Sequence, residues 1–303
     1  MTPTNKEIRI VQFVHPGPEH RPSRKIQKAG VYPWNYLGHR RKYMKALGAY
    51  VDDDGAIKED TVYFWGEGEP WWNVNAILPE NHIGDFPWFL HEPFFYSSPQ
   101  AYPPYSVLGK DPRRYHRQNT DPFVFGDHFI YSLCKQDHYN VLRTLAPGSI
   151  ILFGSPRNIK TCDPYFALDT VLVVGNSIEY VPEMPESSIG SAMPAHYNKI
   201  MGFKDWHDSK SKFFYQGVNF DEKSAYGGMF SFVPCSIGNH GKQGFERIKL
   251  CALDLDFISS NLSQGIKSTV STLEQNIAAW QKICSIVKVQ GCMKGVHFDY
   301  CCL

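Results

Sequence analysis

Two apolar runs near the middle of the chain decide the expected fold. Residues 149–153 are Ser-Ile-Ile-Leu-Phe, and residues 166–174 are Phe-Ala-Leu-Asp-Thr-Val-Leu-Val-Val. Both runs are rich in β-branched and other apolar side chains and alternate little with polar ones, which is typical of strands buried in the middle of a sheet. The sequence therefore predicts a central sheet built around these two strands.

Strand patterns on both sides of this pair extend the predicted sheet. They alternate apolar and polar residues or are rich in aromatic and β-branched ones. The segments are 8–14, 61–65, 212–220, 229–233 and 247–255.

Three helices are expected besides these strands. Residues 39–47 suit a short basic helix that Gly48 would end. Apolar residues from Ile130 to Leu145 follow a one-faced helical spacing after a turn at Gly126-Asp127. Apolar residues also recur at three- and four-residue steps over 266–287, which predicts an amphipathic helix packed on the sheet.

Together these patterns favour an α/β fold, with mixed α+β as the variant. We expect one unit over residues 1–303, with a central mixed sheet, long aromatic-rich loops and a C-terminal amphipathic helix. Residues 79–118 are rich in Pro, aromatic residues and His and show little periodicity, so a long inserted loop is expected there.

Composition indicates an ordinary globular protein. Of the 303 residues, 43% are hydrophobic and 20% are charged, and no apolar run is long enough to span a membrane. The first residues lack the apolar centre of a signal peptide, so a cytoplasmic protein without membrane contact is expected. The eight cysteines are scattered without a disulfide or zinc-site spacing, which favours reduced thiols.

The charge distribution is more informative than the net charge of +1. Residues 20–50 contain no Asp or Glu but many Arg and Lys, and an acidic block follows immediately. A local phosphate-binding patch at Arg40, Arg41 and Lys42 is therefore compatible with a neutral protein, and DNA is the expected partner. A solvated basic face without a ligand is the alternative.

Aromatic residues make up 15% of the chain and gather in its first half. Flat rings stack on nucleobases, and Asn and Asp side chains can bond to the edges of a heterocycle. The sequence predicts a base-binding pocket whose members are Asn119, Asp121, Trp65, Phe123, Phe125 and Tyr131.

Four residues are candidates for catalysis. Cys134 and His138 would share one helical face, so the imidazole could activate the thiol. Glu67 lies among tryptophans, where desolvation could raise its pKa, and Asp127 could serve as an acid. The alternatives are a core cysteine and solvated carboxylates. Cys235, after a predicted strand, is a second candidate thiol.

No cofactor is expected. His15, His20, Cys134 and His138 have the chemistry of zinc ligands, but their spacing matches no standard zinc site. Glycine-rich signatures of nucleotide-binding loops are absent from the sequence, as is a serine-hydrolase elbow.

Several short strings resemble one protein type. They are Asn-Thr-Asp-Pro-Phe-Val-Phe-Gly at 119–126, Tyr-Ser-Leu-Cys at 131–134, Gly-Glu at 66–67 and Gly-Met-Phe-Ser-Phe-Val-Pro at 228–234. They resemble an uncharacterised type of bacterial protein associated with DNA-modification and defence loci. The resemblance implies a role in placing 7-deazaguanine bases in DNA, beside other DNA-modification proteins, by hydration of 7-cyano-7-deazaguanine to the 7-amido form.

Two other classes of function stay open. A non-catalytic reader of modified bases would use the same aromatic pocket and basic residues without a thiol, an acid or a base. A carbohydrate or small-metabolite hydrolase would use the Trp-flanked glutamates Glu67 and Glu69 and would not need the basic stretch.

Overall fold

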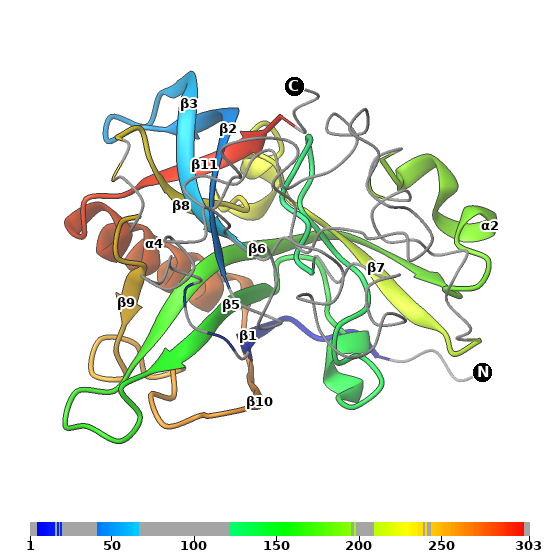
Figure 1. Ribbon diagram of the computed structural model, residues 1–303. Helices are drawn as coiled ribbons and strands as arrows, with labels where there is room; N and C mark the ends of the chain where they lie inside the picture. Colours follow the sequence, from blue (N-terminus) through cyan, green and yellow to red (C-terminus); the bar gives the residue numbers. More distant parts are fainter. Residues whose placement is uncertain are drawn as a thin grey trace, which may run out of the picture.

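The computed structural model describes residues 5–15, 17, 19, 41–66, 121–194, 197, 209–238, 240 and 244–299. These residues form a mixed sheet with few helices, which confirms the expected fold class. Figure 1 shows the strands and the long helix α4. The loop expected at 79–118 lies outside the described residues.

The larger sheet has the strand order β10-β1-β5-β6-β7-β4, and β9 pairs with β6 beside this path (Figure 1). β1 and β5 run parallel, whereas the other neighbouring strands of this sheet run antiparallel. The strands are β1 (Arg9–Val14), β4 (Ile130–Tyr131), β5 (Ile150–Arg157), β6 (Tyr165–Tyr180), β7 (Lys212–Gly217), β9 (Ile248–Leu250) and β10 (Gly265–Val270).

The two apolar runs of the sequence become β5 and β6, and they pair in the middle of this sheet. Residues 150–155 of β5 and 166–174 of β6 are all buried, as their lack of polar alternation predicts. The expected strand at 212–220 is β7, and only three residues of the one expected at 247–255 form β9. Of the strand expected at 229–233, only Val233 belongs to a strand, β8, and Phe232 forms an isolated bridge with Val171.

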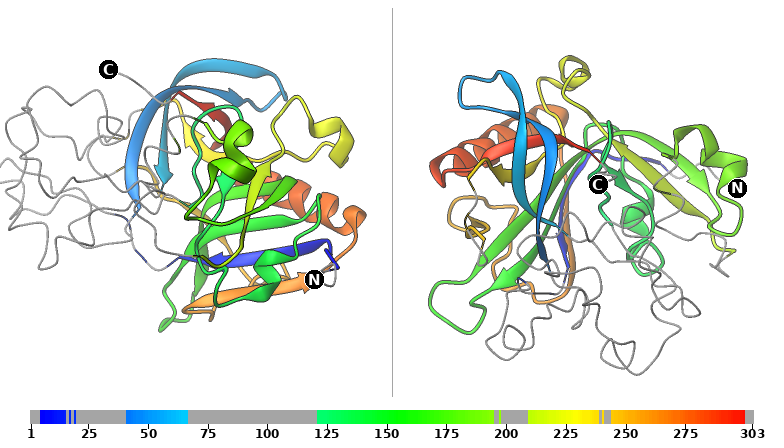
Figure 2. Two further views of the ribbon diagram at one scale, coloured as in Figure 1. Left: turned by 90° about the vertical axis from the view of Figure 1, so that its right-hand side faces the viewer. Right: turned by 45° about the horizontal axis from the view of Figure 1, so that its top comes forward.

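A second, smaller sheet closes on itself in the order β11-β2-β3-β8. Figure 2 shows the curved ribbon that β2 and β3 form beside the large sheet. The strands are β2 (Lys42–Val51), β3 (Ile57–Gly66), β8 (Val233–Ser236) and β11 (Met293–Phe298).

The helix predicted at 39–47 is wrong, because residues 42–47 belong to β2. β3 pairs with β2 along its whole length, and burial follows a period of two, with Met44, Ala46 and Tyr50 in the core. Gly48 allows a close approach rather than ending a helix, since a Cβ there would lie 2.3 Å from the His297 carbonyl oxygen. Pairing with a partner strand has overridden the local helical pattern.

The C-terminal amphipathic helix is present but starts later than predicted. Residues 265–270 form strand β10, and α4 runs over Leu273–Val289. Thr272 caps α4 and forms a capping box with Gln275, which fixes the first residue of the helix. α2 (Glu186–Ile189) and 3-10 turns at Asn140–Arg143, Gly190–Ala192 and Lys223–Tyr226 are the other helical segments of the described chain.

The helix predicted from Ile130 to Leu145 is also wrong. Ile130–Tyr131 is strand β4, and a tight turn follows in which Lys135 has a left-handed φ of 63°. The carboxylate of Asp121 accepts the backbone N–H groups of residues 132–134. A side chain distant in sequence therefore replaces helical hydrogen bonding, and Cys134 and His138 do not share a helical face.

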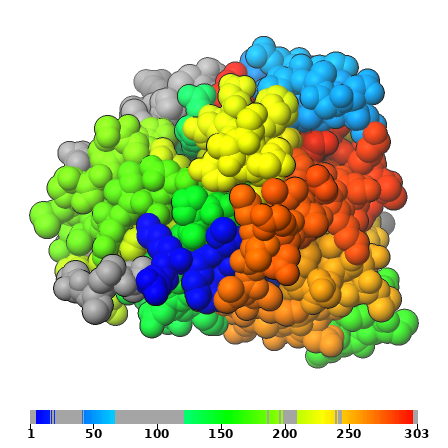
Figure 3. All heavy atoms as spheres, turned by 180° about the vertical axis from the view of Figure 1, so that it is seen from behind, coloured from blue at the N-terminus to red at the C-terminus, as the bar shows by residue number. Residues whose placement is uncertain are grey.

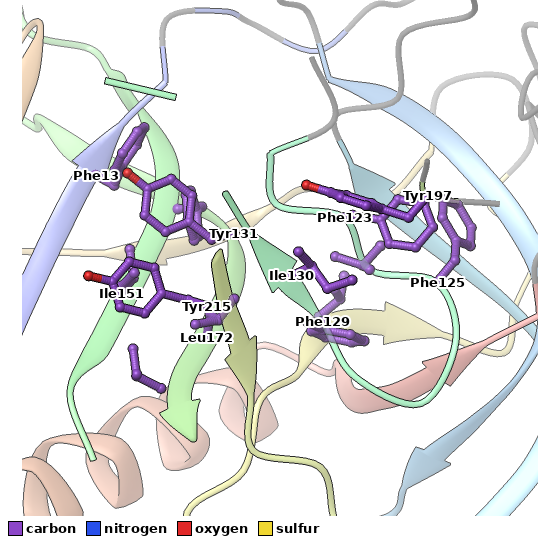
Figure 4. Close-up of a cluster of buried hydrophobic side chains, with 14 of the residues drawn as sticks. Phe13, Phe123, Phe125, Phe129, Ile130, Tyr131, Ile151, Leu172, Tyr197 and Tyr215 are labelled. Atoms are coloured by element: carbon purple, nitrogen blue, oxygen red, sulfur yellow. The ribbon is translucent and has the colours of Figure 1, made fainter. Parts of the chain in front are cut away.

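Aromatic side chains dominate the core under the Cys134 turn. Tyr131 lies between Phe13 and Tyr215, with ring centroids 5.7 Å from each (Figure 4). Seen from behind, the N-terminal residues lie beside the segment of the chain that contains β10 and α4 (Figure 3). The core thus holds the end of β1 and the end of β4 together.

Candidate thiol site at the end of β1

A cysteine and a histidine meet where β1 and β4 end. The Nε2 atom of His15 lies 3.0 Å from the Sγ atom of Cys134. His15 is 3% exposed, whereas Cys134 is half-buried. At this distance either the thiol donates its proton to the imidazole, or a protonated imidazole donates to the thiolate. A neighbouring imidazole is what a nucleophilic thiol requires.

The pair lies at the carboxyl end of β1, whose parallel neighbour β5 continues to Arg157. β1 and β5 are parallel, and the backbone N–H of His15 donates to the carbonyl oxygen of Gly154 at 2.8 Å. The imidazole packs edge-on against Phe13, with ring centroids 5.0 Å apart.

Asp121 holds the turn that carries Cys134. Its fully buried carboxylate accepts the backbone N–H of Ser132 at 3.0 Å, of Leu133 at 2.6 Å and of Cys134 at 2.7 Å. Burial raises the pKa of Asp121, while the three N–H groups and nearby His15 act in the opposite direction. Asp121 is predicted to bind a base, but both of its carboxylate oxygens accept hydrogen bonds from the backbone around Cys134.

Other buried polar side chains fix the same turn. The hydroxyl of Tyr131 donates to the Cys134 carbonyl oxygen at 2.7 Å. Burial raises the pKa of Tyr131 well above its usual value, so the hydroxyl remains a donor. Gln136 donates to the carbonyl oxygens of Ser132 and Phe213, both at 2.7 Å, and accepts the N–H of Phe213. Cys134 therefore sits on a rigid turn.

The aromatic residues predicted to stack on a base are core residues in this structure. Trp65, Phe123, Phe125 and Tyr131 are between 0% and 4% exposed. Trp65 donates its indole N–H to the Phe245 carbonyl oxygen at 2.7 Å. Figure 4 shows Phe123, Phe125 and Tyr197 packed together. A base could reach these rings only after neighbouring side chains had moved.

Arg41, predicted to bind phosphate, is buried in an ion-pair network. Its guanidinium donates to Asp169, which also accepts from Arg247. Arg247 in turn pairs with Glu19 at 2.7 Å, and Arg157 pairs with Glu19 at 2.6 Å. The network connects the residues after β1 with the start of β2, the end of β5, the middle of β6 and the start of β9.

The remaining predicted site residues lie elsewhere. His138 is exposed, and Asp127 is 87% exposed, 3.5 Å from His297. The pairing of Cys134 with His138 is therefore corrected: the histidine at Cys134 is His15, because residues 133–138 form a turn rather than a helix. Glu67, Asn119 and Arg40 lie outside the described residues, as does the side chain of Lys42.

The second candidate thiol, Cys235, is fully buried in β8, and burial raises its pKa far above the usual value. It is a core cysteine of the small sheet. His15 was recognisable in the sequence as a residue at the end of a strand. No local pattern links it with Cys134, which lies 119 residues further along the chain.

The described residues contain no group of three His, Cys, Asp or Glu side chains that could hold a metal ion. A groove of about 650 Å³ lies between residues 252–257, the end of β10 and α4. Neither Cys134 nor His15 lines it, so it is separate from the thiol site.

Comparison of the chain with protein-family models, with curated proteins and with solved structures gives no match. Within the part of the chain that the structure describes, no helix has the length and apolar character needed to cross a membrane.

Proposed function

We propose that this protein is a cysteine-dependent enzyme that hydrates a nitrile on a nucleobase, with 7-cyano-7-deazaguanine in DNA as the substrate. The observation that carries the proposal is the 3.0 Å contact between His15 Nε2 and Cys134 Sγ on a rigid turn. A thiol beside an imidazole is suited to attack an electrophilic carbon, and the nitrile carbon is one.

The residues of the pair account for every proton in the reaction. His15 takes the thiol proton, the thiolate adds to the nitrile carbon, and the imidazolium protonates the nitrile nitrogen. One carbon–sulfur bond forms, one carbon–nitrogen π bond breaks, and a thioimidate results. Water then adds to the same carbon. His15 takes a proton from this water and passes it to the nitrogen, so a tetrahedral intermediate with a hydroxyl and an amino group results. His15 then takes the hydroxyl proton of this tetrahedral intermediate and delivers it to sulfur as the carbon–sulfur bond breaks, which forms the carbonyl of the carboxamide and restores the thiol.

The reaction consumes one water and transfers no electrons, so the two side chains need no further reactant. The product is an amide when the sulfur leaves the tetrahedral carbon, and an acid when ammonia leaves. We propose the amide outcome because the strings at 119–126 and 131–134 resemble proteins associated with 7-deazaguanine modification.

The burial of polar side chains around Cys134, which costs desolvation free energy, supports a catalytic role for this cysteine. Asp121, Ser132 and Gln136 are 0% exposed, and an apolar core would avoid the desolvation that such groups require. Active sites hold reactive groups with this kind of buried hydrogen-bonding shell.

Support for a DNA substrate comes from the basic stretch within residues 20–50. Arg41 is committed to Asp169, so the proposed phosphate contacts belong to Arg40, Lys42 and their basic neighbours in the sequence. A base within a duplex would have to be flipped out to meet Cys134.

The test is to incubate the protein with DNA that carries 7-cyano-7-deazaguanine, digest the DNA and measure the masses of the nucleosides. We expect a gain of one water with the wild type and with Cys162→Ala, whose cysteine is exposed in the β5–β6 connection. Cys134→Ala should reduce conversion at least about a thousandfold, because the nucleophile is lost.

Folded wild-type protein that produces no mass gain would refute the nitrile substrate. Full activity of Cys134→Ala would refute thiol catalysis while leaving the substrate intact. If the wild type and Cys134→Ala bind the modified DNA equally well and neither converts it, the protein is a reader of the base.

A further inference from the structure

Lys135, the residue after Cys134, reaches across to the strand that carries His15. Its ammonium donates to the carbonyl oxygen of Val14, the residue before His15, and to that of Gly265 at 3.2 Å. Val14 and Gly265 are register partners in the β1–β10 pair. The Lys135 side chain thus forms hydrogen bonds to both β1 and β10 at the point where β1 ends.

The same ammonium lies 4.9 Å from the centroid of the Phe13 ring, and the His15 imidazole packs on that ring. The contact is a cation–π interaction. Lys135 therefore touches the residues on the amino side of His15, while its own backbone continues directly from Cys134. One side chain connects the two halves of the thiol site.

The backbone conformation of Lys135 is also unusual. Its φ of 63° lies in the left-handed region, which a lysine rarely adopts. Such a conformation persists where surrounding contacts determine it, and residues of this kind are enriched at functional sites. The left-handed turn after Cys134 directs the Lys135 side chain toward β1.

We propose that Lys135 is a positioning residue that holds His15 within hydrogen-bonding reach of Cys134. The proposal rests on the proposed function only in its catalytic consequence, because the effect on the thiol is measurable without any substrate. Loss of the ammonium removes the hydrogen bonds that join the residue after Cys134 to the end of β1, and a displacement well below about 1 Å between Cys134 and His15 is enough to slow a proton transfer.

The experiment measures alkylation of Cys134 by iodoacetamide, peptide by peptide, with exposed Cys162 as the internal reference. Lys135→Met removes the ammonium and keeps the left-handed residue, whereas Lys135→Gly also relieves the backbone strain. Lys267→Met is the matched control. Lys267 is on β10, and its ammonium likewise donates to two backbone carbonyls, those of Asp256 and Ile258.

We expect both Lys135 variants to lower the Cys134 rate roughly tenfold relative to Cys162, and Lys267→Met to leave the ratio unchanged. The pH–rate profile of Lys135→Met should coincide with that of His15→Asn. Lys135→Met should slow alkylation no further in a His15→Asn background, because both changes break the same contact. Thermal unfolding of each variant shows whether it is folded.

Unchanged alkylation in folded Lys135→Met and Lys135→Gly would overturn the proposal, as would additive effects of Lys135→Met and His15→Asn. A slowed Cys134 together with a wild type that hydrates no nitrile would retain the positioning role and refute the proposed reaction. The two failures are therefore distinguishable.

Discussion

Asp121 tests at the level of a single residue how rigid the Cys134 turn must be. Both of its carboxylate oxygens accept backbone N–H groups, and an amide at this position could accept with only one oxygen. Asp121→Asn would direct an NH₂ group at a backbone donor. We expect a loss of about 2–4 kcal/mol in the free energy of unfolding, measured in denaturant, and slower alkylation of Cys134.

The matched control is Asp127→Asn, which makes the same chemical change six residues away. Asp127 is 87% exposed, so we expect a change within about 0.5 kcal/mol. Equal effects of the two substitutions would show that the three N–H contacts of Asp121 contribute nothing particular to the turn.

At the level of the elements, what the sequence could predict depended on how local the signal was. β5 and β6 were predictable because a continuous run of apolar residues indicates a buried strand without reference to the rest of the chain. β2 was not, because its strand state depends on pairing with β3. The Cys134–His15 contact depends on the packing of β1 against β4, and Asp121 overrides the helical spacing after Ile130, so residue spacing predicted the wrong histidine.

The start of α4 depends on Thr272, whose hydroxyl accepts the N–H of Gln275 while the Gln275 side chain accepts the N–H of Thr272. This reciprocal pair lets the helix begin directly after β10. Thr272→Ala should lower the free energy of unfolding by about 1 kcal/mol, measured in denaturant, whereas Thr272→Ser keeps the hydroxyl and should lie within about 0.3 kcal/mol of the wild type. Equal losses in both variants would assign the effect to the Thr272 methyl group instead.

At the scale of the whole molecule, the ion-pair network around Glu19 connects segments that are far apart in the sequence. Asp169 is the extra residue of a β-bulge in β6, since Phe153 pairs with Thr170 and Gly154 with Leu168. The bulge turns the Asp169 carboxylate toward Arg41 and Arg247. Through Glu19, the polypeptide after β1, which contains His15, is thereby tied to Arg157 at the end of β5 and to Arg247 just before β9.

This network predicts how stability changes in acid. Burial by itself raises the pKa of Glu19, but the ion pairs with Arg247 and Arg157 outweigh it and lower the pKa from 4.5 to about 2. A carboxyl with a lowered pKa in the folded state stabilises that state above its unfolded pKa, and the stabilisation is lost as pH falls through the folded value.

Glu19 should therefore contribute on the order of 3 kcal/mol to the free energy of unfolding at pH 7, and this contribution should be lost between about pH 4.5 and pH 2. Denaturant unfolding of the wild type and Glu19→Gln across this range measures the contribution, with Glu59→Gln, at an exposed position of β3, as the control. We expect the gap between wild type and Glu19→Gln to be widest at neutral pH and to close near pH 2, because protonated Glu19 no longer pairs with either arginine. A gap that stays constant with pH would mean that Glu19 acts by packing rather than by charge.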